Sequence, residues 1–230
     1  MKTILFVGDS ITDAGRNRED PRNLGQGYPC FIAGRLGLSA PGKYHFLNRG
    51  ISGDRVVDIY ARIKQDILNL KPDVVSILVG INDVWHEMDF RNGINASKFE
   101  KIYRMLLEEI REALPNTKII LIEPFVLKGT ATATQLTWFI EEVTARANAV
   151  RKLAAEFSLP FLPLQADLNE LAKQAPEEYW LIDGVHPTVN FHQYIADKWI
   201  HSFEKYLEDD VKMNESIERS LNSKKRVQNL

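Results

Sequence analysis

Ser10 is the residue whose type and position could do nucleophilic chemistry, since it stands in a polar turn directly after an apolar run. A serine hydroxyl is a weak nucleophile until a neighbouring base takes its proton during attack. At the start of a helix, such a serine would also lie beside free backbone N–H groups that can hold a developing anion. Ser10 is therefore a candidate nucleophile, and the alternative is an ordinary helix N-cap.

The candidate bases are the five histidines of the chain: His45, His86, His186, His192 and His201. His186 differs from the others because it lies in a loop with Asp183 three residues before it. This carboxylate could accept the Nδ1 proton and stabilise the imidazolium, which leaves Nε2 to face Ser10. The alternative is that Asp183 and His186 form a surface pair without a chemical role.

Gly53 and Asn82 stand in two further polar turns and could stabilise a negatively charged oxygen. Attack on an acyl carbon creates such an oxyanion, and each aligned donor lowers the barrier by roughly 3 kcal/mol. Gly53 can supply a backbone amide and Asn82 a side-chain amide, although each could be an ordinary turn residue. The ordered combination with Ser10 and the Asp183 to His186 pair favours covalent catalysis over separate structural roles.

Five short, mostly apolar runs indicate the strands that must position these residues: 3–7, 44–47, 74–79, 118–122 and 159–164. Apolar runs without alternation are typical of strands that are covered on both faces, as in a parallel sheet. Pro160 and Pro163 remove two ladder donors and place the fifth strand at a sheet edge.

Apolar residues spaced by three or four predict helices between the strands, at 99–114, 139–157 and 191–203. Ser97 and Glu100 predict a capping box for the first of these, and Pro115 predicts its end. The alternation predicts an α/β fold, a three-layer α/β/α sandwich with a five-stranded parallel sheet in the flavodoxin-like order 2-1-3-4-5. In this order the turns at 8–12, 48–53 and 80–83 face one crevice.

The chain has 230 residues with a net charge of -2, so it has no strong positive excess for binding nucleic acid or an anionic membrane. We expect one domain over residues 1–206 and a charged extension over 207–230. The charged and polar composition of this extension predicts a solvated or frayed helix. The alternative is a segment that binds a partner or forms an oligomer. No nucleic acid and no membrane are expected as partners.

The single cysteine, Cys30, cannot form an intrachain disulfide, and no Cys/His cluster suggests a zinc site. We expect Cys30 to be a buried, inert thiol and not a nucleophile. We expect no metal and no cofactor. The apolar run that precedes Asp9 is too short for a signal-peptide core, which predicts a cytoplasmic protein; a removed secretion signal would leave the same appearance.

The ordered segments resemble the blocks of the GDSL serine esterases, also called SGNH hydrolases. The similar segments are GlyAspSerIleThr at 8–12, AsnArgGlyIleSerGly at 48–53, GlyIleAsnAsp at 80–83 and AspGlyValHisPro at 183–187. The resemblance implies that Ser10 is the nucleophile and that Asp183 and His186 complete a triad. It also implies an oxyanion hole formed by the amide of Ser10 together with Gly53 and Asn82.

Within that family, the strings at 12–16 and 82–85 look most like bacterial acetylxylan esterases and related carbohydrate deacetylases. This resemblance implies removal of O-acetyl groups from xylan or xylo-oligosaccharides through an acyl-serine. It implies a small acetylated sugar or oligosaccharide as substrate and a homo-oligomer as a further expectation. The subgroup form carries Trp directly before the triad Asp, where this chain has Ile182. The candidate substrate contacts are Asp9, Arg16, Trp85 and Trp180.

Two alternatives stay open from the sequence. The first is a lipid or thioester acyl hydrolase of the same family, which would favour other acyl groups. The second is a phosphate-binding, flavodoxin-like module without catalysis. In that module Ser10 and Gly53 would cradle an anion, and Asp9 and Asp83 would assist Mg²⁺.

Overall fold

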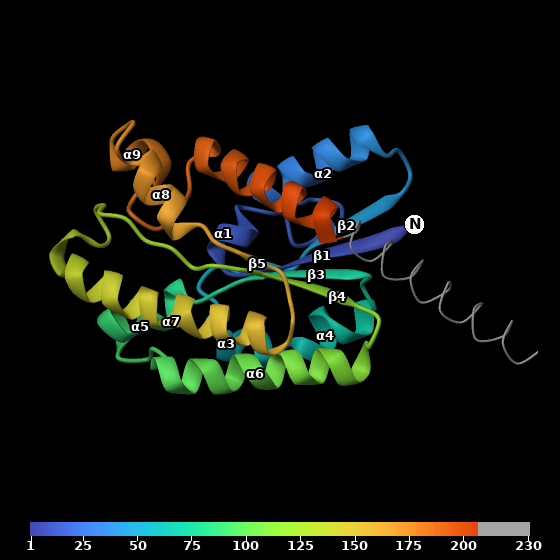
Figure 1. The fold of residues 1–230 in the computed structure, drawn as a ribbon, viewed down its shortest axis with the longest axis horizontal. Coiled ribbons are helices and arrows are strands. Elements are labelled where there is room, and N and C mark those ends of the chain that lie inside the picture. Colours follow the sequence, from blue (N-terminus) through green and yellow to red (C-terminus); the bar gives the residue numbers. More distant parts are fainter. Residues whose placement is uncertain (207–230) are drawn as a thin grey trace, which may run out of the picture.

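The computed structural model describes residues 1–206, in which a parallel sheet lies between two layers of helices (Figure 1). The strands are β1 (Lys2–Gly8), β2 (Tyr44–Asn48), β3 (Val74–Leu78), β4 (Lys118–Ile122) and β5 (Phe161–Leu162). They are hydrogen-bonded in the order β2-β1-β3-β4-β5, and every pair is parallel. The predicted sandwich and strand order are confirmed. The predicted extension at 207–230 lies outside the described residues.

The sequence of the central strand β1 is continuously apolar because the strand is covered on both faces. Ile4 and Phe6 pack into the core on one face of the sheet, whereas Leu5 and Val7 pack into the core on the other face. All four side chains are fully buried. Since successive strand residues point to opposite faces, a strand covered on both faces has no polar positions.

Helices cover both faces of the sheet (Figure 1). On one side lie α2 (Tyr28–Ser39), α8 (Gln165–Leu171) and the helical residues 189–206; on the other lie α3 (Val56–Ala61), α4 (Ile63–Asp66), α6 (Ala96–Ala113) and α7 (Leu136–Glu156). Short 3₁₀ turns occur at Leu68–Leu70 and Ala133–Gln135. Trp199 donates a hydrogen bond of 2.9 Å to Ser76 Oγ, which fixes helix 189–206 on β3.

Proline residues set the ends of two elements as the sequence predicts. Helix α6 ends at Ala113, two residues before Pro115. Pro160 and Pro163 flank β5, which forms an edge of the sheet and is shorter than the predicted run of 159–164. A proline has no N–H to donate to the ladder, so only the residues between the two prolines form the strand.

Two local predictions were wrong. Helix α6 is capped by Asn95, whose side chain accepts from the N–H of Lys98, and not by a box of Ser97 and Glu100. Glu100 instead forms an ion pair with Arg104 one turn further along the helix. Cys30 is exposed and not buried, because α2 buries the opposite stripe of its surface against the core.

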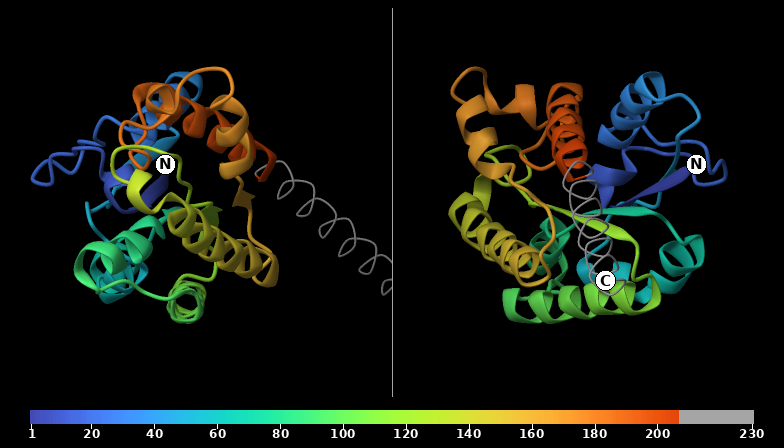
Figure 2. Two further views of the ribbon diagram at one scale, coloured as in Figure 1. Left: turned by 90° about the vertical axis from the view of Figure 1, so that its left-hand side faces the viewer. Right: turned by 45° about the vertical axis from the view of Figure 1, so that its right-hand side comes forward.

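The carboxyl ends of the strands carry three short helices: α1 (Ser10–Asp13) after β1, α5 (Ile81–Phe90) after β3, and α9 (Glu177–Trp180). In Figure 1, β1 runs from the N-terminus toward α1, and the left view of Figure 2 looks onto this edge of the sheet. Within residues 1–206, no helix combines the length and apolarity that a membrane span requires.

Candidate active site

Three side chains predicted to act together form one hydrogen-bonded chain. Ser10 Oγ lies 2.9 Å from His186 Nε2, and His186 Nδ1 lies 2.7 Å from Asp183 Oδ2. An ionised carboxylate only accepts hydrogen bonds, so Nδ1 carries the hydrogen and the Nε2 of the neutral ring accepts from Ser10. This is the connectivity of a Ser–His–Asp triad, in which the imidazole can take the serine proton during attack.

The backbone of its own loop holds Asp183 in place. Asp183 Oδ1 accepts the N–H of Val185 at 2.9 Å and that of His186 at 2.8 Å, which leaves Oδ2 for the imidazole. Gly184 has φ +96°, and an added Cβ would lie 2.7 Å from the carbonyl oxygen of Leu127. The close approach of two loops therefore requires glycine at this position.

The carboxylate and the imidazole shift each other's pKa in opposite directions. The hydrogen bond to Asp183 raises the pKa of His186 above its ordinary 6.5, although burial opposes this rise. Burial alone would raise the pKa of Asp183, but the hydrogen bonds from His186 and the two backbone amides outweigh it and lower this pKa to about 2. Asp183 is therefore ionised at neutral pH and can stabilise the imidazolium that forms during proton transfer.

Asp9, not Ser10, caps helix α1, and this removes the alternative that Ser10 is the N-cap. Asp9 Oδ1 accepts from the N–H of Ile11 at 2.9 Å. The side chain is 1% exposed, and burial raises its pKa to about 7. The carboxyl group of Asp9 lies beneath the turn and not at the surface, which disfavours the predicted contact of Asp9 with substrate.

Residues that the sequence analysis missed tie the turn after β2 to the Ser10 turn. Asn48 Nδ2 donates to the carbonyl oxygen of Thr12 at 2.6 Å, and Asn48 Oδ1 accepts from the N–H of Gly50 at 2.8 Å. Arg62 reaches both turns, since its Nε donates to Asp54 Oδ2 at 2.7 Å and its Nη2 to the carbonyl oxygen of Gly8 at 3.4 Å. Asn48 could have been found from the sequence, because it begins the segment 48–53. No motif in the sequence points to Arg62.

Gly53 and Asn82 lie in the two turns that flank the Ser10 turn. Gly53 has φ +88°, and an added Cβ would have no heavy atom closer than 4.0 Å, so glycine is needed here for its backbone conformation and not for space. Asn82 lies in the first turn of α5 and donates from Nδ2 to the carbonyl oxygen of Asp54 at 3.2 Å. This bond links the two predicted oxyanion donors through adjacent residues.

A cavity of about 440 Å³ opens beside Ser10 and His186. Its lining residues are Ser10, Ile11, Ala14, Gly15, Gln26, Ser52, Ile182, His186, Pro187, Thr188, Val189 and His192. Ile182 and Val189 at its mouth are 64% and 66% exposed. The nucleophile and base thus face a space with polar groups in its lining and an aliphatic rim.

Comparison with known proteins shows the family to which the chain with this Ser10–His186–Asp183 site belongs. Residues 6–194 match the model of the GDSL-like lipase/acylhydrolase family. The chain belongs to this family. The GDSL hydrolase is 33% identical over 202 residues to an acetylxylan esterase of Geobacillus stearothermophilus, covering 84% of this chain and 90% of the relative. It is accordingly a carboxylic ester hydrolase.

Solved structures share the fold of this GDSL hydrolase. A structure from Parabacteroides merdae, described as GDSL-like, has a TM-score of 0.83 at 38% identity, over 87% of this chain and 94% of that one. The Geobacillus acetylxylan esterase has a TM-score of 0.78 at 32% identity, over 87% and 93%. Variants of that esterase in which a serine, an aspartate or a histidine is replaced by alanine are described as catalytic mutants.

Trp85, one of the predicted substrate contacts, lies beside the triad of the GDSL hydrolase. Its half-buried ring lies 5.9 Å from the ring of His186, measured between centroids. Its other neighbour is Phe139, whose ring meets it edge to face at 6.5 Å. Trp85 therefore forms a wall next to the base, and its contact with substrate stays a prediction.

Arg16 and Trp180 do not line the Ser10 cavity, and their contact with substrate stays a prediction. Arg16 Nε donates to the carbonyl oxygen of Gly50 at 2.9 Å, and the side chain lines a separate hollow together with Arg49. Trp180 packs against the apolar core from α9, with its indole N–H buried. The sequence places both residues close to the site, but side-chain direction decides what each of them contacts.

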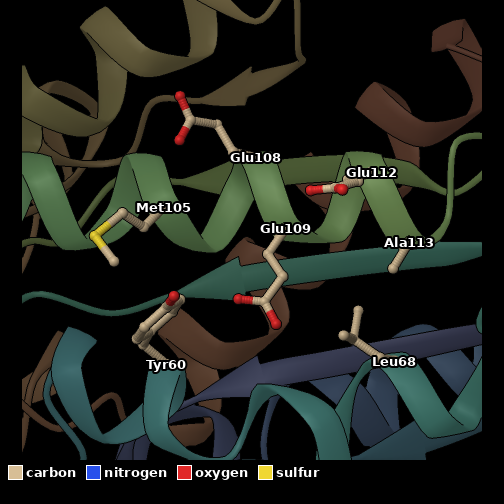
Figure 3. Close-up of a pocket in the computed structure, with 7 residues that line it drawn as sticks. All are labelled: Tyr60, Leu68, Met105, Glu108, Glu109, Glu112 and Ala113. Carbon is tan, nitrogen blue, oxygen red and sulfur yellow. The ribbon is translucent and has the colours of Figure 1, made fainter.

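A second hollow of the described chain and the buried Asp83 bear on the alternative sites that the sequence leaves open. The hollow between α6 and the α3 to 3₁₀ segment is lined by Tyr60, Leu68, Met105, Glu108, Glu109, Glu112 and Ala113, a set without any histidine (Figure 3). Asp83, assigned to Mg²⁺ in the module alternative, is fully buried, and both carboxylate oxygens lie within 3.2 Å of the N–H of Val56. Among residues 1–206, no group of three His, Cys, Asp or Glu side chains is placed to hold a metal ion.

Proposed function

We propose that this GDSL hydrolase is a carbohydrate O-deacetylase that removes acetyl groups from xylan or xylo-oligosaccharides through an acyl-serine intermediate. The observation that carries the proposal is the hydrogen-bonded chain from Ser10 to Asp183, which opens onto a cavity of about 440 Å³ lined in part by polar groups. The similarity to the Geobacillus acetylxylan esterase supports the choice of substrate class.

In the proposed reaction, Ser10 Oγ attacks the acetyl carbonyl carbon while His186 Nε2 takes the hydroxyl proton. The carbonyl oxygen becomes an oxyanion, which the amides of Ser10 and Gly53 and the side chain of Asn82 stabilise. His186 then donates its proton to the sugar oxygen as the C–O bond to the acetyl carbon breaks. Water, deprotonated by His186, attacks the acetyl-serine; His186 then returns this proton to Ser10 Oγ as the bond from Oγ to the acetyl carbon breaks and acetate leaves.

The catalytic mutants of the Geobacillus relative support the roles of Asp183 and His186. In the Geobacillus esterase, the aspartate of one catalytic mutant precedes the histidine of another by three positions, which is the separation of Asp183 and His186. A further solved variant replaces the tryptophan directly before that aspartate with isoleucine. This chain carries Ile182 at the corresponding place, so its cavity has an aliphatic edge where the relative has an indole ring.

The proposed activity is tested by measuring acetate release from a panel of acetylated xylo-oligosaccharides and other acetylated sugars. We expect acetyl esters of xylose units to be cleaved fastest. The exposed side chains of Ile182 and Val189 at the cavity mouth favour the alternative, a lipid or thioester acyl hydrolase. A rate that rises from acetyl toward long acyl chains would establish that alternative and overturn the deacetylase.

The pH dependence of catalysis follows from the pKa of His186. The base must be neutral to accept the serine proton, so activity is lost as pH falls through its pKa. Because the hydrogen bond to Asp183 raises this pKa, we expect the acidic limb of kcat/KM to have its midpoint above 6.5. The measurement is a profile from about pH 4 to 9 with 4-nitrophenyl acetate, and a rate that stays flat down to about pH 4 would exclude His186 as the base.

Replacement of Asn82 tests the oxyanion donor. We expect Asn82→Ala to lower kcat by about 10²- to 10³-fold with little change in KM, because the donor acts mainly on the charge of the transition state. The matched control is Asn169→Ala on the outer face of α8, whose side chain accepts from Gln165, and we expect its kinetics to be unchanged. An N82A enzyme with a wild-type kcat would remove Asn82 from the oxyanion hole.

Assembly and location stay predictions for this GDSL hydrolase. We expect a homo-oligomer, for which light scattering of the purified full chain is the test. A cytoplasmic location is expected from the sequence, and fractionation of the producing cells would test it.

A further inference from the structure

A second imidazole, that of His192, lies at the cavity that contains Ser10 and His186. It belongs to helix 189–206 and is 7% exposed, so only a small part of its surface meets the cavity. The proposed reaction does not use it. Its hydrogen bonds determine what it can offer to a substrate.

The backbone fixes the tautomer of His192. The N–H of Tyr28 donates to His192 Nδ1 at 3.2 Å, so this nitrogen is an acceptor without a hydrogen of its own. Burial lowers the pKa of His192 to about 4, which keeps the ring neutral at neutral pH. In a neutral imidazole with an accepting Nδ1, the hydrogen is on Nε2. His192 is therefore a hydrogen-bond donor at Nε2 and cannot act there as a base.

His192 is part of the cavity lining, and within the described part of the chain its Nε2 is free to donate. Among residues 1–206, Nε2 has no hydrogen-bond partner, yet it is not one of the fully enclosed unpartnered atoms. Because the side chain lines the cavity with Ser10, the accessible part of the ring faces the space a substrate enters. A donor held in this way gains a hydrogen bond only from a group that enters the cavity, and it favours oxygen acceptors.

Packing holds the ring of His192 rigidly in this position. The ring stacks on that of Tyr28 at 6.4 Å, and the Tyr28 hydroxyl forms a hydrogen bond of 2.9 Å with Thr12 Oγ1, two residues after Ser10. A Cβ added to Gly27 would lie 2.9 Å from His192 Cε1, so glycine at this position allows the ring to pack closely. Gln26 and Thr188 add polar side chains to the same lining.

We propose that His192 is a specificity-determining residue whose Nε2–H donates a hydrogen bond to a hydroxyl or ring oxygen of the sugar part of the substrate. The proposal rests on the proposed function, since it assigns the polar lining of the cavity to the alcohol part of the ester. The acetyl carbonyl needs no such donor, because the oxyanion hole serves it. His192 therefore distinguishes esters of sugars from esters whose alcohol part lacks acceptor oxygens.

The test compares kcat and KM of three variants on mono-O-acetyl xylobiose and on 4-nitrophenyl acetate. Asn in H192N keeps an oxygen near the place of Nδ1 for the Tyr28 N–H but removes the donor into the cavity. We expect its kcat/KM to fall about tenfold on the sugar ester, mainly through KM, and to stay within about twofold on 4-nitrophenyl acetate. H192Q places an amide N–H near the position of Nε2, so we expect it to retain more of the sugar-ester activity.

H192F provides a second removal of the donor, because it keeps a ring for stacking on Tyr28 and loses both nitrogens. We expect the same selective loss with a lower Tm, since the Tyr28 N–H loses its acceptor. If H192N does not fold, the kcat/KM values of H192F on the two esters test the role of His192 instead. Equal losses on both esters, or no loss on the sugar ester, would overturn the role of His192. A wild-type enzyme that cleaves 4-nitrophenyl acetate but no acetyl xylobiose would overturn the proposed function itself, and this inference with it.

Discussion

Ser10→Ala is expected to lower kcat for 4-nitrophenyl acetate by at least about 10⁴-fold, the largest effect of any single substitution considered for this enzyme. The variant lacks the oxygen that forms the acyl intermediate, so only the oxyanion donors and binding contribute to the residual rate. Its fold should be intact, because within residues 1–206 the hydroxyl of Ser10 bonds only to His186. Steady-state kinetics and thermal unfolding measure both effects.

The control for Ser10→Ala is Ser39→Ala at the end of α2, where the hydroxyl donates to the carbonyl oxygen of Leu36. We expect this variant to keep wild-type kinetics. A fluorophosphonate probe adds a covalent readout, since it should label the wild-type enzyme and S39A but not S10A. Substantial esterase activity or labelling in S10A would show that another residue is the nucleophile.

Asp183→Asn is expected to lower kcat by about 10⁴-fold while leaving the loop in place. The amide oxygen of Asn can still accept the N–H groups of Val185 and His186 as Oδ1 does now. The amide nitrogen, however, would face His186 Nδ1 as a donor, so the ring would adopt the tautomer with its hydrogen on Nε2. That tautomer cannot accept the proton of Ser10.

The pH profile separates this tautomer effect from general damage. With Asp183→Asn, the hydrogen bond that raises the pKa of His186 is lost, so the acidic midpoint of the residual activity should move to lower pH. Asp197→Asn is the matched control, because this exposed carboxylate on helix 189–206 bonds only to the Gln193 amide in the described chain. A D183N enzyme with unchanged kcat and midpoint would rule out Asp183 as the partner of His186.

Much of the architecture could be predicted because the local pattern of apolar residues indicates which faces of an element are buried. In β1, Ile4 through Val7 are apolar on both faces, and this pattern indicates a parallel sheet without any knowledge of the strands beside it. Pro160 and Pro163 likewise mark the edge strand, since the missing N–H groups act wherever the strand lies. The capping of α6 was mispredicted because Asn95 and Ser97 are both capping residue types, and only the backbone path selects one.

Side-chain direction limited the prediction of the site. Asp9 is adjacent to Ser10 in sequence, yet it points beneath the turn and caps α1. Arg16 turns to the carbonyl oxygen of Gly50, and Trp180 turns into the core. His192, in contrast, has no sequence feature that separates it from other polar residues of a helix. It lines the cavity of Ser10 because its helix packs beside α2.

The layered fold, the family and the residue types that must meet for acyl transfer can be predicted from the amino-acid sequence. Burial pattern and the order of short segments are local properties, and they survive without coordinates. Packing of distant elements brings Ser10 and His186, separated by 176 positions, to 2.9 Å from each other and places His192 in the lining of the same cavity. Contacts of this kind depend on how distant elements pack and on where each side chain points. Local sequence patterns predict neither the packing nor the side-chain direction.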